Sequence, residues 1–207
     1  ANQFLELVEN AIFVNDGGDG TFGPGDYFLF YGIGMHGWRY SPLSQRFYHQ
    51  FNIYSEKTYY FITIDPGIGE KKRITSVDYS SLTPNITTNH FTYYDFYEKD
   101  KINFTESGKF WVDEPFDAQL TKRYTFQTPT HNGEPARITI AAASNNTQVS
   151  SFTITVNGAH FATMPLSRNT NTHAFYDSQT YSINQITSPL RIDLTYNKPY
   201  PSAAAYL

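Results

Sequence analysis

Strict alternation of apolar and polar residues runs through the second half of the chain. Residues 152–156 read Phe-Thr-Ile-Thr-Val, and residues 190–196 read Leu-Arg-Ile-Asp-Leu-Thr-Tyr. Side chains on a β-strand point to opposite faces in turn, so a period of two predicts strands with one buried face. Asn157-Gly158 follows the first of these runs, and both residues tolerate the positive φ of a two-residue turn. We therefore predict a hairpin between residues 152–156 and 160–164.

The sequence predicts an all-β fold with two β units. Phe and Tyr, with 17 of each among 207 residues, favour strands because flat side chains fit a pleated surface. The clean alternation after Leu120 is typical of an antiparallel, jelly-roll-like β-sandwich. Because the pattern of apolar and polar residues changes near residues 113–116, we place a domain boundary there. The N-terminal β-rich domain is expected at 1–113 and the β-sandwich at 114–207. We expect the sandwich to continue beyond Leu207, as part of a longer protein.

The first unit carries strands of a different kind. Residues 26–31 read Asp-Tyr-Phe-Leu-Phe-Tyr without alternation, which predicts a strand buried on both faces. Residues 1–14 predict one short strand before it. Residues 32–42 predict a loop, because they contain several glycines and a proline, which interrupt regular structure. Residues 46–54 and 58–64 predict two further strands.

The loop between the first two strands is rich in Asp and Gly. If Gly20 is the sixth residue of an EF-hand-type calcium loop, Asp19 takes position five and Asp26 takes the closing carboxylate position. Gly17 then falls on position three and supplies no side-chain oxygen. Two interpretations stay open. One is a structural calcium ion with candidate ligands Asp16, Asp19, Thr21 and Asp26. The other is a β-turn whose Asp side chains cap their own backbone.

Several functional classes are excluded by what the sequence lacks. It contains no cysteine, which removes disulfides and a thiolate nucleophile, and its net charge of -4 without a basic cluster argues against nucleic-acid binding. No serine-nucleophile elbow, phosphate-binding loop or apolar run long enough for a membrane helix is present. The six histidines show no metal-ligand spacing, so we interpret each, including His36 and His49, as a structural or surface residue. No catalytic residue is assigned.

Five segments, in order, resemble the gingipain-type cysteine peptidases of the type IX secretion system in Bacteroidetes. They are DGGDGTFGPGDYFLFYG (16–32), FYHQFNIYSEKTYYFIT (47–63), YDFYEKDKINFTESGKFWVDEPF (94–116), SFTITVNG (151–158) and LTYNKPYPSAAAYL (194–207). The likeness is to the branch that removes sorting domains from secreted cargo. It covers nearly the whole chain and corresponds to the region upstream of the peptidase domain.

The resemblance implies a surface or outer-membrane-associated protein whose catalytic Cys and His lie in a downstream peptidase domain. This chain has no position for that dyad, so it is expected to be non-catalytic, while the parent chain is expected to be a cysteine endopeptidase. The implied partners are the downstream peptidase domain and, beyond it, secreted cargo or other components of the secretion system. The implied task is to scaffold the peptidase domain or to contact cargo or translocon.

Two other functions stay open at this point. Exposed aromatics such as Trp38 and Trp111 would suit a carbohydrate-binding or adhesin-like module, although core packing is the commoner use of such residues. A free-standing hydrolase would need paired carboxylates, and no spacing indicates them.

Overall fold

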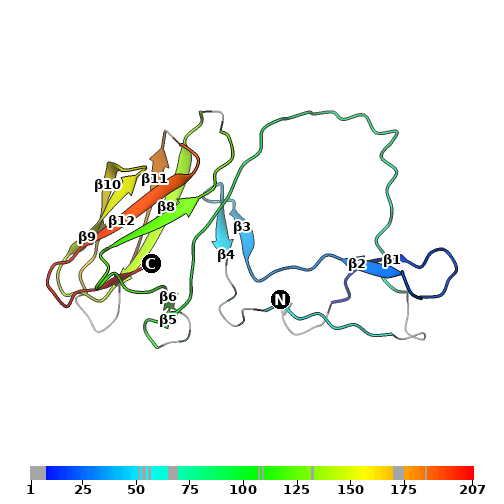
Figure 1. Ribbon diagram of the computed structural model, residues 1–207, viewed down its shortest axis with the longest axis horizontal. Helices are drawn as coiled ribbons and strands as arrows, with labels where there is room; N and C mark the ends of the chain where they lie inside the picture. The colour runs from blue at the N-terminus through cyan, green and yellow to red at the C-terminus, as the bar shows by residue number, and fades with distance from the viewer. Residues whose placement is uncertain are drawn as a thin grey trace. The chain divides into compact units, whose positions relative to one another are not determined.

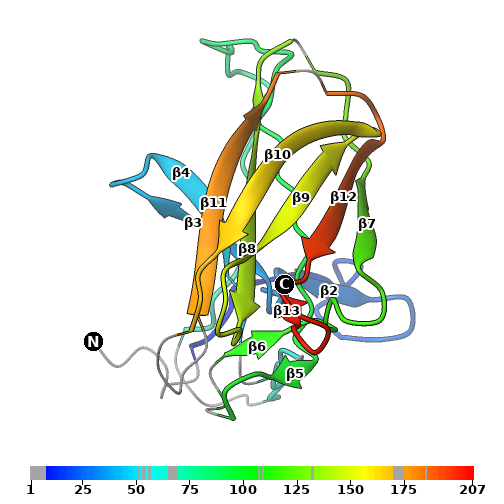
Figure 2. The ribbon, with the colours of Figure 1, turned by 90° about the vertical axis from the view of Figure 1, so that its left-hand side faces the viewer.

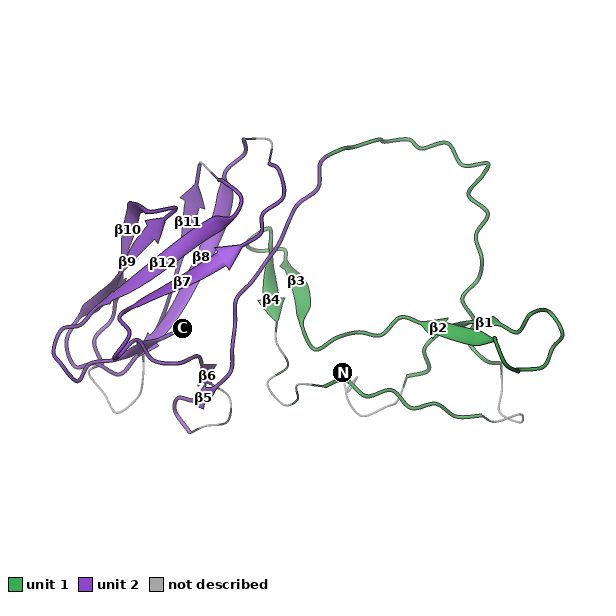
Figure 3. Cartoon of the chain, in the orientation of Figure 1, with its two compact units in different colours: residues 1–89 green, residues 90–207 purple. Residues whose placement is uncertain are grey.

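The computed structural model describes residues 8–50, 52, 55, 57–64, 70–106, 108, 110–131, 133–169, 175–184 and 186–207. Within these residues every regular element is a β-strand, which confirms the all-β prediction (Figure 1). The chain divides into two units, unit 1 at Ala1–Asn89 and unit 2 at His90–Leu207 (Figure 3).

Unit 2 contains two antiparallel sheets, with strand orders β10-β9-β12-β7 and β11-β8-β13 (Figure 2). The strands are β7 (Thr121–Phe126), β8 (Ala136–Ser144), β9 (Ser150–Val156), β10 (Ala159–Leu166), β11 (Phe175–Ile183), β12 (Leu190–Asn197) and β13 (Ala205–Tyr206). A short pair, β5 (Ile102–Asn103) and β6 (Trp111–Val112), precedes them. The sheets form the expected β-sandwich, while the jelly-roll topology stays a prediction.

The core of unit 2 follows the alternation in the sequence. Along β9, Phe152, Ile154 and Val156 are buried and the intervening threonines are half-buried. Ile154 lies opposite Leu194 of β12, so the buried residues of neighbouring strands share one face. Phe152 meets the ring of Phe116 at a centroid distance of 4.8 Å. Full burial of one such side chain contributes about 1.5–3 kcal/mol.

The turn between β9 and β10 confirms the hairpin prediction. Asn157 and Gly158 have φ values of 50° and 88°, in the left-handed region that this turn requires. The side-chain amide of Asn157 also donates to the Thr187 hydroxyl, and its carbonyl oxygen accepts the backbone N–H of Arg191. Asn157 therefore shapes the hairpin and also ties it to the start of β12.

Unit 1 is built from two separate hairpins. β1 (Ile12–Asn15) pairs with β2 (Tyr27–Phe30), and β3 (Gly37–Ser41) pairs with β4 (Arg46–Gln50). A backbone hydrogen bond of 2.9 Å from Ile74 to the carbonyl of Ile12 attaches a distant segment to β1. Every buried hydrophobic side chain in the part of the chain that the structure describes belongs to unit 2, so these hairpins carry no comparable core.

Three predictions for unit 1 are wrong in part. The strand expected at 26–31 is present as β2, yet Leu29 is 57% exposed instead of buried, because β2 belongs to a two-stranded sheet and no second sheet formed by the described residues of unit 1 packs on Leu29. The loop expected at 32–42 contains β3. Residues 58–64 form no strand, since strand propensity is realised only where a partner strand completes the hydrogen bonds. Of the segment 1–14, residues 1–7 lie outside the described part of the chain.

The expected domain boundary at 113/114 and the unit boundary at 89/90 differ by the segment 90–113. That segment has little regular structure, but its side chains contact the sandwich. The Tyr97 ring meets the ring of Tyr124 on β7 edge to face, with centroids 4.7 Å apart. The backbone N–H of Asp113 donates to the carbonyl of Leu207 at 2.7 Å. These contacts place the segment in unit 2.

Candidate functional site

The acidic loop joins β1 to β2, and its carboxylates bind the loop's own backbone. One oxygen of each accepts a nearby N–H, and the pairs are Gly18 N–H to Asp16 (3.0 Å), Thr21 N–H to Asp19 (2.8 Å) and Gly23 N–H to Asp26 (2.5 Å). The backbone bends through glycines with positive φ, such as Gly18 and Gly20. This geometry matches the β-turn interpretation of the loop.

The calcium site stays a prediction. Each carboxylate has a second oxygen beside the one used in the loop. Among the described residues, no group of three or more His, Asp or Glu side chains is arranged to hold a metal ion. Asp16, Asp19, Asp26 and Thr21 are thus neighbours in one loop, without the geometry of a preformed site.

An aromatic face lies on the β3–β4 hairpin. Trp38 is paired with His49 and Tyr40 with Phe47, so these four side chains point to the same side. The Tyr40 and Phe47 rings lie 5.2 Å apart between centroids. Trp38, Tyr40 and Phe47 remain exposed. We call this set the β3–β4 aromatic face.

A pair of histidines completes one end of that face. The Nδ1 atom of His36 lies 3.1 Å from the Nε2 atom of His49, and the two rings are stacked with centroids 5.1 Å apart. The Trp38 ring meets His49 edge to face at 5.4 Å. Sequence reasoning missed this pair because it treated residues 32–42 as a loop. Only the register of β3 on β4 brings position 36 beside position 49.

A second polar cluster surrounds the buried carboxylate of Asp113 in unit 2. The Tyr97 hydroxyl donates to Asp113 Oδ2 at 2.8 Å, and Lys101 Nζ lies 3.1 Å from Asp113 Oδ1 and 2.8 Å from Glu114 Oε1. Burial opposes ionisation of Asp113, but the hydrogen bonds from the Glu114 backbone, Tyr97 and Lys101 outweigh it and lower its pKa. Burial and the bond to Asp113 raise the pKa of Tyr97 to about 12.

Both shifts move the pKa of the group away from neutrality, so the Asp113 cluster is not suited to acid–base chemistry. We call it a clasp, meaning a set of polar contacts that fastens one segment to another. At neutral pH Asp113 is ionised and Tyr97 is protonated, and neither group changes charge near pH 7. General acid–base catalysis needs a group whose pKa lies near the working pH. Nearby, Lys122 Nζ donates to the backbone carbonyl of Glu114 at 2.7 Å and lies over the Phe116 ring. The cluster fastens the segment before β7 to the sandwich.

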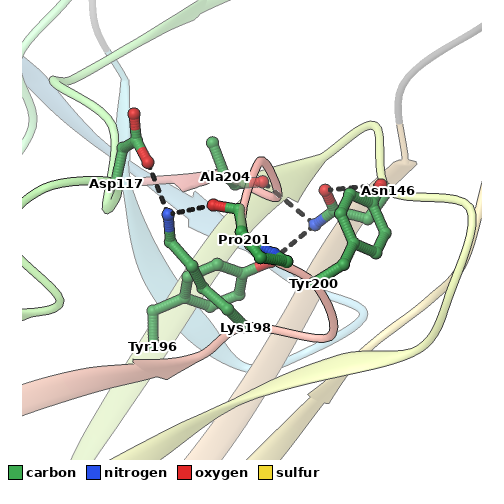
Figure 4. A network of polar contacts seen from close by, with 7 residues as sticks. All are labelled: Asp117, Asn146, Tyr196, Lys198, Tyr200, Pro201 and Ala204. Atoms are coloured by element: carbon green, nitrogen blue, oxygen red, sulfur yellow. Dashed lines mark hydrogen bonds and ion pairs between the residues drawn. The ribbon is translucent and has the colours of Figure 1, made fainter.

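The third polar network fixes the last turn of the chain (Figure 4). Asn146, which is 1% exposed, donates from Nδ2 to the Tyr196 hydroxyl at 2.6 Å and to the Ala204 carbonyl at 3.0 Å. Lys198 pairs with Asp117 in the same region. The segment after β12 is therefore held in place before β13 joins β8.

The described residues thus contain three polar arrangements that sequence reasoning did not identify. None of the three combines a nucleophile with a neighbouring base, which nucleophilic catalysis requires.

No helix long and apolar enough to cross a membrane occurs in the described ranges.

Comparison with solved structures finds a likeness in fold. The crystal structure of dimeric latent PorU from Porphyromonas gingivalis matches with a TM-score of 0.59 and 14% sequence identity. The match covers 96% of this chain and 18% of the PorU chain. The fold is PorU-like. At this identity the likeness concerns the fold alone, and the chain spans less than a fifth of PorU.

Sequence-based comparisons add nothing to this likeness. No protein-family model and no curated protein matches the chain. The comparison with PorU is therefore a likeness of fold, at 14% sequence identity.

Proposed function

We propose that this chain is the non-catalytic N-terminal portion of a gingipain-type cysteine peptidase, the PorU-like signal peptidase of a type IX secretion system. The observation that carries the proposal is the PorU-like fold across 96% of the chain. The sequence motifs shared with that family support it. Because these 207 residues contain no cysteine, the peptidase chemistry belongs to another part of the parent chain. Such a protein works at the cell surface, associated with the outer membrane.

The task we assign to the chain is to scaffold the peptidase domain. Unit 1 exposes large apolar side chains on both hairpins, including Leu29 on β2 and Tyr40 on β3. Exposed apolar surface of this extent marks interaction sites, since water disfavours it. The downstream peptidase domain of the same chain is the partner we favour, and secreted cargo or another secretion component is the alternative.

A split-chain experiment tests this assignment. Residues 1–207 and the remainder of the parent protein are expressed separately, and their association is measured by co-purification and calorimetry. We expect binding that Tyr40→Ser with Phe47→Ser abolishes. Val149→Ser is the matched control, because Val149 is exposed on unit 2. Binding that all variants retain equally would refute a scaffold built on the β3–β4 aromatic face.

A second candidate function is binding of carbohydrate. It is favoured by the exposed Trp38 and Tyr40 side chains, because aromatic rings on one face can stack on sugar rings. Trp111 is less suited, since it is half-buried and its indole N–H donates to the Gly108 carbonyl. Affinity electrophoresis in polysaccharide gels checks this function. Retardation lost on Trp38→Ala but kept on Trp111→Ala would favour it over the scaffold.

A further inference from the structure

The nitrogens of His36 and His49 lie close enough for one ion to bind both. Two nitrogens that are each about 2.0–2.1 Å from a tetrahedral zinc ion are about 3.3–3.4 Å apart, and a square arrangement brings them to about 2.9 Å. The observed separation of 3.1 Å lies between these values. The separation is therefore one that two nitrogens on a single ion require, and both rings turn when the ion binds, because in the hydrogen bond the two nitrogens point at each other.

We propose that His36 and His49 form a two-histidine site for a divalent late transition metal such as Cu²⁺, Ni²⁺ or Zn²⁺. Imidazole nitrogens suit these ions, whereas Ca²⁺ and Mg²⁺ require oxygen ligands. No carboxylate joins the pair in a three-residue group within the described ranges.

The proton count of the pair is compatible with this binding. In the hydrogen-bonded pair one of the two facing nitrogens carries a hydrogen and the other accepts it. When a metal ion binds, the donor histidine shifts its hydrogen to its other ring nitrogen, so both facing nitrogens offer a lone pair. Two neutral imidazoles bind the ion with no net loss of protons from the pair.

The hairpin register supplies the orientation that such a site needs. His36 precedes β3, His49 lies on β4 opposite Trp38, and the Trp38 ring packs edge to face on His49. The ion would link the two strands of a hairpin that has little other packing. Binding to the folded hairpin alone stabilises it by mass action.

Fluorescence titration with Cu²⁺ tests the proposal directly. The 207-residue chain is prepared without a histidine tag and with Trp111→Phe, which leaves Trp38 as the single tryptophan. We expect saturable quenching of Trp38 because Cu²⁺ on His49 lies close to the indole ring. Loss of an outer-shell partner weakens metal binding about 10- to 100-fold, so His36→Gln or His49→Gln, which removes a direct ligand, weakens it at least tenfold.

The control variant is His160→Gln, since His160 is exposed on β10 in unit 2 and should leave the Cu²⁺ affinity unchanged. Electron paramagnetic resonance of the Cu²⁺-loaded chain gives a readout that does not depend on folding of a variant. Coupling to two imidazole nitrogens supports the site. Coupling to fewer than two, or unchanged affinity in the His36→Gln, His49→Gln double variant, overturns it.

Discussion

Replacement of Asn146 by alanine measures how much the Asn146 side chain contributes to the free energy of unfolding of unit 2. The substitution removes the two hydrogen bonds from Nδ2, to the Tyr196 hydroxyl and the Ala204 carbonyl. Each bond contributes about 1 kcal/mol, and a buried group left without a partner costs about 1–3 kcal/mol. We therefore expect Asn146→Ala to lower the free energy of unfolding of unit 2 by about 2–4 kcal/mol.

Asn145 offers a matched control because it is the same residue type, adjacent in the chain and exposed. Asn145→Ala should change stability by less than about 0.5 kcal/mol, as surface substitutions usually do. Asn146→Asp should cost more than Asn146→Ala at pH 7, because it directs a buried negative charge at the Ala204 carbonyl oxygen. At acidic pH the carboxyl becomes a donor again, so the aspartate variant should recover part of its stability.

Urea unfolding followed by Trp111 fluorescence is the assay, in a Trp38→Phe background so that the signal reports on unit 2. The slope of the free energy against urea should be the same in all variants if only stability changes. Equal midpoints for Asn145→Ala and Asn146→Ala would refute the reasoning. So would an aspartate variant whose stability does not depend on pH.

Three further predictions concern the other features. The pKa of Asp113 is lowered by folding, so its carboxylate stabilises unit 2 above the unfolded pKa of about 3.9 and loses that effect as pH falls through the folded value. Asp113→Asn should therefore flatten the loss of stability below about pH 4 in acid-unfolding curves, whereas an unchanged curve would contradict the clasp. If the acidic loop binds calcium, a chelator should lower the melting temperature of the chain and Asp19→Ala should abolish that effect; a melting curve that neither chelator nor added calcium moves leaves the loop as a turn. Hydrogen exchange in the 207-residue chain should show strong protection for amides in β9 and little in β2, because an isolated two-stranded hairpin is marginally stable.

The fold of unit 2 was predictable because its strands alternate. In each neighbouring pair such as Ile154 and Thr155, the apolar residue is predicted to face the core and the polar residue to face away from it. Asn157-Gly158 predicts where the chain reverses. The partner of each strand was not readable, since β12 reaches β9 across more than thirty residues. The Asn146 network was missed for the same reason, because it joins residues 50 and 58 positions apart. The Asp113 cluster was missed because it lies in a segment with little regular structure, whose course the sequence does not predict.

The strands of unit 1 were harder to predict because their aromatic runs have no period. A run such as Tyr27 to Phe30 is compatible with burial on two faces, on one face or on neither, and only the surrounding layers decide. The histidine pair depends on a further step, since it exists only when β3 is recognised as a strand and its register on β4 is known. The two histidines are 13 positions apart in the sequence, and that spacing carries no such information.

Aromatic side chains such as Phe152 are buried in unit 2 and those such as Tyr40 are exposed in unit 1, and the number of packed sheets in each unit explains this difference in burial. In unit 2 Phe152 is fully buried because the second sheet covers the inner face of β9. A lone hairpin such as β3–β4 has two faces, and the described residues of its unit form no layer over the aromatic one, so Tyr40 and Phe47 stay exposed. A partner surface would bury them in the way that the second sheet buries Phe152. The scaffold proposal therefore predicts that hydrogen exchange in β3 and β4 slows when the parent peptidase domain is added, while exchange in β9 is unchanged. Carbohydrate binding at the same face would leave the exchange rates unaffected by that domain.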